Sequence, residues 1–202
     1  HTRYWRDWSS NVCSSDLADE VVAKPEWIES LAHAGDLQRV LTAEEYQQRL
    51  DGRLARFGSG EIPAAEFALF RREQILRILL RDVLGYATLP DVTEELSHLA
   101  GAILDCAYRR LRDNLVARYG APAAGMSIVA LGKLGGSELN YSSDIDLMFV
   151  YSGHGDTPGP QSISYREFFK KVCVQLTELL STYTPHGACY RIDLRLRPEG
   201  TL

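Results

Sequence analysis

The 202-residue sequence lacks any uninterrupted apolar stretch of about 20 residues, the length that a membrane-spanning helix requires. Its N-terminus carries Arg3, Arg6 and Asp7 but no apolar segment of the kind found in a secretory signal. The sequence therefore predicts no membrane association and no export, and we expect a cytoplasmic location.

Cysteine is scarce. The four cysteines, Cys13, Cys106, Cys173 and Cys189, lie far apart and form no C-x-x-C pair. This spacing fits neither a zinc site nor a dense disulfide framework. It favours a reduced, cytosolic setting.

A basic excess is also missing, since 22 basic residues face 27 acidic ones and the formal net charge is −5. This balance argues against a general nucleic-acid binder. With 45% hydrophobic and 24% charged residues, the chain is not predicted to be disordered. No internal repeat or low-complexity tract is present.

Both ends of the sequence look cut. There is no initiator methionine, and residues 1–17 hold two of the three tryptophans without a helical or strand period. We interpret residues 1–17 as a disordered or foreign segment. The sequence stops at Leu202 directly after a charged, strand-like stretch, so we interpret the chain as a fragment.

Residues 18–122 are predicted to form a helical region. Apolar side chains recur at spacings of three to five between Phe67 and Val83, with Gly85 as a candidate C-cap. A second helix is predicted after Leu89-Pro90, ending near Gly120. The two helices are expected to pack together as a platform.

Residues 123–202 change in character and predict a small catalytic module. Two apolar runs, 127–131 and 144–151, indicate strands separated by a glycine-rich turn. Ser164 and Glu167 predict a capping box before an amphipathic helix that continues to Tyr183. A third strand is predicted over 188–197, so the fold class is α+β.

Two carboxylates open the second strand. Asp144 and Asp146 share one face by period-two alternation, while Ile145 and Leu147 point the other way. Neighbouring carboxylates repel unless a cation lies between them, and hard oxygen ligands suit Mg²⁺ or Mn²⁺. Two surface acids at a solvated strand edge are the alternative for this motif alone.

The third predicted strand alternates strictly between apolar and polar residues. Its polar face carries Arg191, Asp193, Arg195 and Arg197. Arginine matches phosphate oxygens well, and Asp193 is a third candidate metal ligand if this strand lies beside the second. An exposed face of mixed charge is the alternative.

The turn between the first two strands contains Gly132, Lys133, Gly135 and Gly136, followed by Ser137 as a possible helix N-cap. Glycines let a backbone approach phosphate closely, and a helix N-terminus offers free N–H groups. The P-loop motif is absent. A Rossmann turn is excluded, because only eight residues separate Gly135 from Asp144. Taken alone, the turn is better explained as a tight structural turn between two elements.

Together the glycine turn, the Asp-x-Asp strand and a single later Asp form the pattern of DNA polymerase beta-like nucleotidyltransferases. The segment 130–151 (ALGKLGGSELNYSSDIDLMFVY) resembles a signature of the glutamine synthetase adenylyltransferase family. The segment 190–200 (YRIDLRLRPEG) resembles its second signature. The similarity runs from about residue 64 to 202, and it includes helical residues 75–107.

The resemblance implies a polymerase beta-like fold, a small mixed sheet with helices, behind a helical subdomain. That family carries one domain that removes AMP from a tyrosine of glutamine synthetase and another that attaches it. The residues 140–146 and 190–193 look more like the removing half, in which phosphate attacks the AMP–tyrosine ester and ADP leaves.

On this resemblance, Asp144, Asp146 and Asp193 are catalytic and hold Mg²⁺, with Mn²⁺ as an alternative. Phosphate or nucleotide contacts are expected from the glycine turn and the basic side chains: Gly135, Gly136, Ser137, Lys133, Arg195 and Arg197. The implied partners are glutamine synthetase, phosphate and ADP or ATP, and the PII signalling protein, with no nucleic acid and no membrane.

Two other functions remain open at this stage. The chain could carry the ATP-dependent adenylylating half of the same enzyme. It could also be a regulatory module that binds nucleotide without turnover. A nucleic-acid polymerase is disfavoured by the net charge.

Overall fold

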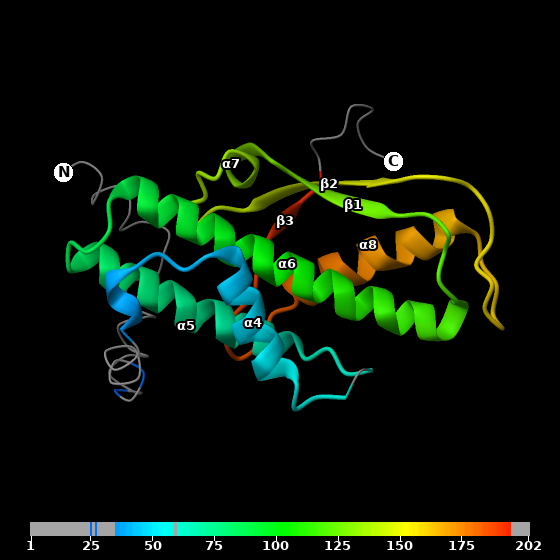
Figure 1. Ribbon diagram of the computed structural model, residues 1–202, viewed down its shortest axis with the longest axis horizontal. Helices are drawn as coiled ribbons and strands as arrows, with labels where there is room; N and C mark the ends of the chain where they lie inside the picture. Colours follow the sequence, from blue (N-terminus) through cyan, green and yellow to red (C-terminus); the bar gives the residue numbers. More distant parts are fainter. Residues whose placement is uncertain (1–24, 26, 28–34, 59, 195–202) are drawn as a thin grey trace.

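The computed structural model describes residues 25, 27, 35–58 and 60–194. It shows an α+β fold, as predicted, with three long helices beside a small sheet (Figure 1). In chain order the elements are η1 (Asp36–Gln38), α4 (Ala43–Leu54), α5 (Ala64–Val83), α6 (Leu89–Tyr119), β1 (Met126–Leu131), α7 (Gly132–Gly135), β2 (Ile145–Tyr151), α8 (Tyr165–Ser181) and β3 (Ile192–Asp193).

The two predicted platform helices are confirmed as α5 and α6. Gly85, just after α5, has φ +74°, and Gly120 is the C-cap that follows α6. At the start of α6, the Thr88 side chain accepts from the Asp91 backbone N–H and the Asp91 side chain accepts in return. This reciprocal capping box satisfies donors that a helix N-terminus leaves free.

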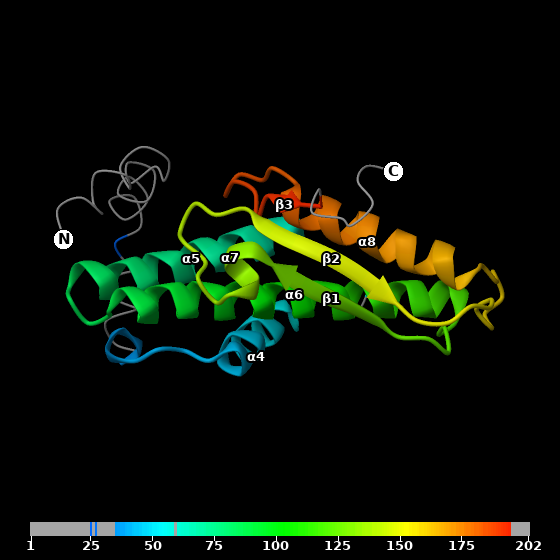
Figure 2. The same ribbon diagram turned by 90° about the horizontal axis from the view of Figure 1, so that it is seen from above.

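The sheet has the order β1-β2-β3 and is mixed. β1 pairs with β2 antiparallel, and β2 pairs with β3 in parallel. The sheet lies over α6 and α8, with β2 on the side nearer α8 (Figure 2). Ile145 and Leu147 are buried on the helix-facing side, so the alternation puts Asp146 on the opposite face.

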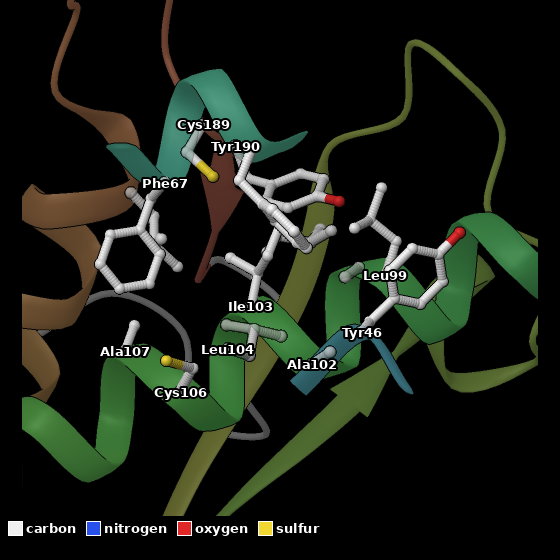
Figure 3. Close-up of a cluster of buried hydrophobic side chains, with 14 of the residues drawn as sticks. Tyr46, Phe67, Leu99, Ala102, Ile103, Leu104, Cys106, Ala107, Cys189 and Tyr190 are labelled. Carbon is white, nitrogen blue, oxygen red and sulfur yellow. The ribbon is translucent and has the colours of Figure 1, made fainter. Parts of the chain in front are cut away.

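One hydrophobic core joins the helices to the strands. It contains side chains from α4, α5 and α6, together with Ile145 and Leu147 of β2. Cys189 and Tyr190, which precede β3, lie in the same cluster near Phe67 and Ile103 (Figure 3). The predicted division near residue 122 therefore crosses a continuous core, and as a domain boundary it stays a prediction.

A second, smaller cluster joins the end of α6 to α8 through Leu115, Tyr119, Phe168, Phe169 and Val172. At the start of α8, the Ser164 hydroxyl accepts from the Glu167 backbone N–H at 3.2 Å. The structure assigns α8 this N-cap without the reciprocal bond, so only half of the predicted capping box is present.

The helical part buries charged side chains as well as apolar ones. The Glu95 carboxylate is fully buried on α6 and forms ion pairs with Arg77 and Arg81 of α5. It also accepts from the Leu41 backbone N–H at 2.7 Å and from the Tyr46 hydroxyl at 3.2 Å. Because buried charge is costly unless paired, this network makes Glu95 a structural anchor.

Three of the four cysteines lie within the described residues, and Cys13 lies outside them. Cys106 and Cys189 are buried free thiols, and the Cys173 thiol contacts Met126 Sδ at 3.8 Å. Burial raises the pKa of Cys106 and of Cys189 to about 12, so both stay protonated and inert. The helices among the placed residues include none long and apolar enough to cross a membrane.

Candidate active site

Asp146 and Asp193 lie side by side on neighbouring strands. In the parallel pairing of β2 with β3, Ile145 is the partner of Ile192 and Asp146 the partner of Asp193. Paired residues of adjacent strands project from the same face, and the strands of a sheet are about 4.8 Å apart. The structure thus brings together the two carboxylates that were predicted to meet across two strands.

Asp144 lies one residue before β2 and has an arginine partner. The Arg191 Nε donates to Asp144 Oδ1 at 2.6 Å, and both side chains are exposed, Arg191 by 75% and Asp144 by 45%. Exposed ion pairs contribute about 0–1 kcal/mol. This pair is therefore weak enough to open when a stronger ligand for either partner arrives.

The three carboxylates supply hard oxygen donors of the kind that bind Mg²⁺ or Mn²⁺. Over residues 35–58 and 60–194, however, no group of three or more His, Cys, Asp and Glu side chains converges closely enough to hold a metal ion. The Arg191 ion pair engages one Asp144 oxygen. The donor chemistry of the three acids fits a divalent cation.

The glycine turn touches the acids through Gly132. This residue has φ +54°, and a Cβ atom added to it would overlap Asp146 Oδ2. Only glycine combines this backbone conformation with so close an approach. Gly132 was not among the predicted site residues, and the close approach predicted for the turn was that of a phosphate, whereas the structure shows the Asp146 carboxylate.

The remainder of the turn differs from the prediction. The turn forms the short helix α7, and Ser137 comes after it with φ +57°. Ser137 therefore does not cap the N-terminus of a helix, because the short helix α7 precedes it and no helix begins directly after it. The Gly136 N–H donates to the Gly132 carbonyl at 3.1 Å and the Ser137 N–H to the Leu134 carbonyl at 3.2 Å.

Both of these N–H donors are thus engaged inside the turn. Phosphate binding by Gly135, Gly136 and Ser137 stays a prediction, as does the role of Lys133, whose side chain is exposed. Arg195 and Arg197 lie outside the described residues. Of the three arginines on the third predicted strand, only Arg191 lies within the described residues, and it contacts Asp144.

The loop before Asp144 is tightly held. Ser143 Oγ donates to Asn140 Oδ1 at 2.5 Å, and the Ser143 N–H donates to the Asn140 carbonyl at 3.2 Å. The Leu139 N–H donates to Ser97 Oγ of α6 at 3.2 Å. These contacts give the polar side chains at 140 and 143 a structural role that the motif alone did not reveal.

Tyr141, in the same loop, reaches α5. Its hydroxyl donates to Asp82 Oδ2 at 3.4 Å. Burial raises the pKa of Asp82, and the Tyr141 hydrogen bond opposes that rise. The platform helices therefore hold the chain immediately upstream of the acids.

A groove of about 490 Å³ lies between α6 and β1, on the helix-facing side of the sheet. His98, Leu104, Tyr108, Ile128 and Ser137 are among its lining residues. Ile128 pairs with Phe149, whereas Asp146 pairs with Leu131, so groove and acids are on opposite faces.

Comparison with known proteins gives this site a context. Residues 10–202 match the family model described as glutamate-ammonia ligase adenylyltransferase. Several relatives carry the name bifunctional glutamine synthetase adenylyltransferase/adenylyl-removing enzyme. The relative from Aromatoleum aromaticum is 46% identical over 132 residues, which cover 62% of this chain and 14% of that protein. The relative from Shewanella woodyi is 37% identical over 194 residues, covering 93% and 20%.

A relative of the same name from Neisseria meningitidis is 38% identical over 172 residues, covering 81% of this chain and 19% of its own length. The chain thus spans a fifth or less of these relatives. The family match includes the glycine turn, both strands that bear the acids and the helices that support them. This chain belongs to the glutamate-ammonia ligase adenylyltransferase family.

Proposed function

We propose that this chain carries a nucleotidyl-transfer site that removes AMP from an adenylylated tyrosine of glutamine synthetase, with inorganic phosphate as acceptor and ADP as product. One observation carries the proposal. Asp146 and Asp193 are register partners on β2 and β3, with Asp144 two residues before Asp146 on the same strand edge. The names of the relatives support the substrate.

The reaction needs little covalent help from the protein. A phosphate oxygen forms a bond to the phosphorus of the AMP–tyrosine ester, and the bond from that phosphorus to the phenolic oxygen breaks. The electron pair goes to the phenolate, which takes up a proton. Because tyrosine has a pKa near 10, its oxygen is a moderate leaving group and stabilisation of its negative charge matters more than a strong general acid.

Asp144, Asp146 and Asp193 would hold a divalent cation, Mg²⁺ or Mn²⁺, on the face of the sheet away from the helices. When bound, such a cation would neutralise charge on the phosphoryl and leaving oxygens. Arg191 lies beside Asp144, and its guanidinium can turn to a phosphate once the carboxylate has another partner. Gly132 keeps the backbone close to Asp146 and leaves room for the carboxylate.

The direction of transfer rests on local sequence. Residues 140–146 (NYSSDID) resemble the removing half of the family more than the attaching half. The PII signalling protein is proposed as a further partner on family grounds. The alternatives are transfer of AMP from ATP to glutamine synthetase, and nucleotide binding without turnover.

One experiment separates these three functions. The chain is incubated with adenylylated glutamine synthetase and phosphate, and in parallel with unmodified glutamine synthetase and ATP, each with Mg²⁺. We expect ADP release in the first reaction and no AMP incorporation in the second. Incorporation only in the second would establish the attaching activity. Nucleotide binding with neither reaction would establish a regulatory module, and full activity in excess chelator would contradict the cation site.

A further inference from the structure

The chain segments that lead into β2 and β3 meet at one residue of α5. The Arg71 guanidinium lies over the Tyr190 ring, with its Cζ atom 4.5 Å from the ring centroid. Arg71 Nη2 also donates to the Tyr141 carbonyl at 3.5 Å. Tyr141 lies three residues before Asp144, and Tyr190 lies three residues before Asp193. Arg71 therefore bridges the entrances of both acid-bearing strands.

Tyr190 is a firm anchor for such a bridge. It is only 4% exposed, and it lies in the hydrophobic core next to Cys189 (Figure 3). Its backbone N–H donates to the Leu180 carbonyl at 2.8 Å. Burial raises the pKa of Tyr190 to about 12 although Arg71 acts against the rise, so the ring stays neutral beneath the guanidinium.

The pairing that this bridge supports is short. In the placed part of the chain, β3 pairs with β2 through two residues, and the Ile145 N–H donates to the Arg191 carbonyl at 3.0 Å. A strand that slips by one residue turns every side chain to the opposite face. A one-residue slip of β3 would therefore carry Asp193 from beside Asp146 to the helix-facing side.

A purely packing role does not explain an arginine at position 71, because burying its polar atoms costs free energy. Among the described residues its Nε atom is buried without a hydrogen-bond partner. A methionine of similar length would fill the space without this cost. The two contacts of the guanidinium, to Tyr190 and to Tyr141, are what a methionine could not replace.

We propose that Arg71, a residue of the helical part, is a positioning residue that fixes the register of β3 on β2 and so keeps Asp193 beside Asp146. The consequence for catalysis rests on the function proposed above, whereas the consequence for strand register does not. Arg71 acts through Tyr141 and Tyr190 and need not touch the substrate.

The test compares three variants of the whole chain by two measurements. Arg71→Met removes the guanidinium and keeps the stem. Arg71→Lys keeps a cation over Tyr190 but loses the planar fork. Arg53→Met is the matched control, because Arg53 pairs with Glu66 and Glu73 of α5, away from the sheet. Amide hydrogen exchange at Ile145 reports the β2–β3 pairing, and Mn²⁺ titration reports the acids.

For Arg71→Met, we expect exchange at Ile145 to accelerate about tenfold relative to amides across the β1–β2 pairing, as for a local opening. Mn²⁺ affinity should fall about tenfold, as when an outer partner of a metal site is removed. Arg71→Lys should lie between parent and Arg71→Met. Arg53→Met should leave both measurements unchanged relative to the parent.

Unchanged exchange at Ile145 in Arg71→Met would overturn the proposal, and so would exchange that accelerates equally over the whole sheet, since that pattern indicates a general loss of stability. If Arg71→Met does not fold, Arg71→Lys decides by the same two measurements. A parent chain that binds no Mn²⁺ would count against the proposed function, while exchange at Ile145 would still decide the role of Arg71.

Discussion

Glu95 in the helical part and Asp144 at the start of β2 are both carboxylates paired with arginine, yet their surroundings differ. Glu95 is fully buried and accepts from two arginines, a backbone N–H and a tyrosine hydroxyl. Asp144 is 45% exposed and pairs with Arg191, whose side chain is itself 75% exposed. The oxygens of Glu95 accept all their hydrogen bonds from buried protein groups. Asp144, in contrast, can exchange its arginine partner for a ligand from solvent.

This difference suits the two carboxylates to different tasks within one chain. A buried, fully paired acid cannot leave its partners without a large penalty, so it serves to hold elements together. An exposed pair is worth little and can be replaced by a cation or a phosphate. The helical part is therefore expected to respond to mutation through stability, and the strand edge through activity and ligand binding.

The largest effect is expected for Asp146→Asn. This change removes the charge of a carboxylate that is the register partner of Asp193, and it preserves the shape of the side chain. We expect release of ADP from adenylylated glutamine synthetase to fall at least about a thousandfold, which corresponds to about 4 kcal/mol in the barrier. Thermal unfolding should change little, and Asp144→Asn should behave alike.

Asp113→Asn serves as the control for these variants, because Asp113 is a surface acid on α6 whose side chain is 71% exposed. It should retain the parent activity. Turnover of Asp146→Asn within tenfold of the parent would contradict the assignment of the acids.

Glu95→Gln tests the opposite side of the comparison. It leaves Arg77 and Arg81 buried without a negative partner, although the amide can still accept from the Leu41 N–H. We expect a loss of about 3 kcal/mol in the free energy of unfolding, the lower end for a broken buried ion pair. Urea denaturation measures it, and a loss below 1 kcal/mol would show that the network is not an anchor.

The contrast also explains what could be predicted from sequence. Helices α5 and α6 were predicted together with their C-terminal glycines, because apolar period and capping residues are local signals. The alternation of β2 correctly placed Asp146 opposite Ile145 and Leu147. The pairing of Asp146 with Asp193 followed once the strands were taken as neighbours.

Contacts between distant segments could not be predicted in the same way. The Asp144–Arg191 ion pair depends on strand register, and the burial of Glu95 depends on how α5 and α6 face each other. The prediction of Ser137 as a possible N-cap was wrong. A serine that follows glycines can stand either before or after a helix, and the local sequence does not distinguish the two positions. The overlap that forces glycine at position 132 depends on the side chain of Asp146.

The contribution of Asp36 to stability is expected to depend on pH. The Asp36 carbonyl accepts from Arg77, a member of the buried Glu95 network. Burial acts to raise the pKa of Asp36, but the Arg49 side chain, which lies 2.7 Å from its carboxylate, and its other arginine neighbours hold it below the ordinary value of 3.8. A lowered pKa in the folded state adds stability above the unfolded pKa, and that stability is lost as the pH falls through the folded value.

Asp36→Asn should therefore cost about 1.5 kcal/mol at pH 7, the scale of a hydrogen bond to a charged group. The difference from the parent should shrink as the pH falls below 3.8, where the unfolded chain takes up the proton first, and vanish once the folded carboxylate is also neutral. Urea denaturation of both chains between pH 7 and pH 3 checks this. A difference that stays constant over that range would show that the charge of Asp36 does not contribute.

The smallest effect, and the sharpest test of the exchangeable pair, is expected for Arg191→Gln. Because Arg191 and Asp144 are exposed, unfolding should shift by less than about 0.5 kcal/mol. Removing the competing guanidinium should raise the affinity of the chain for Mn²⁺ severalfold, about 1 kcal/mol, while the KM for phosphate rises because a phosphate partner is lost.

Arg112→Gln, which removes a comparable exposed arginine 3.7 Å from Asp113, should change neither value. Weaker Mn²⁺ binding by Arg191→Gln would mean that Arg191 supports Asp144 as a ligand and does not compete with the cation for it.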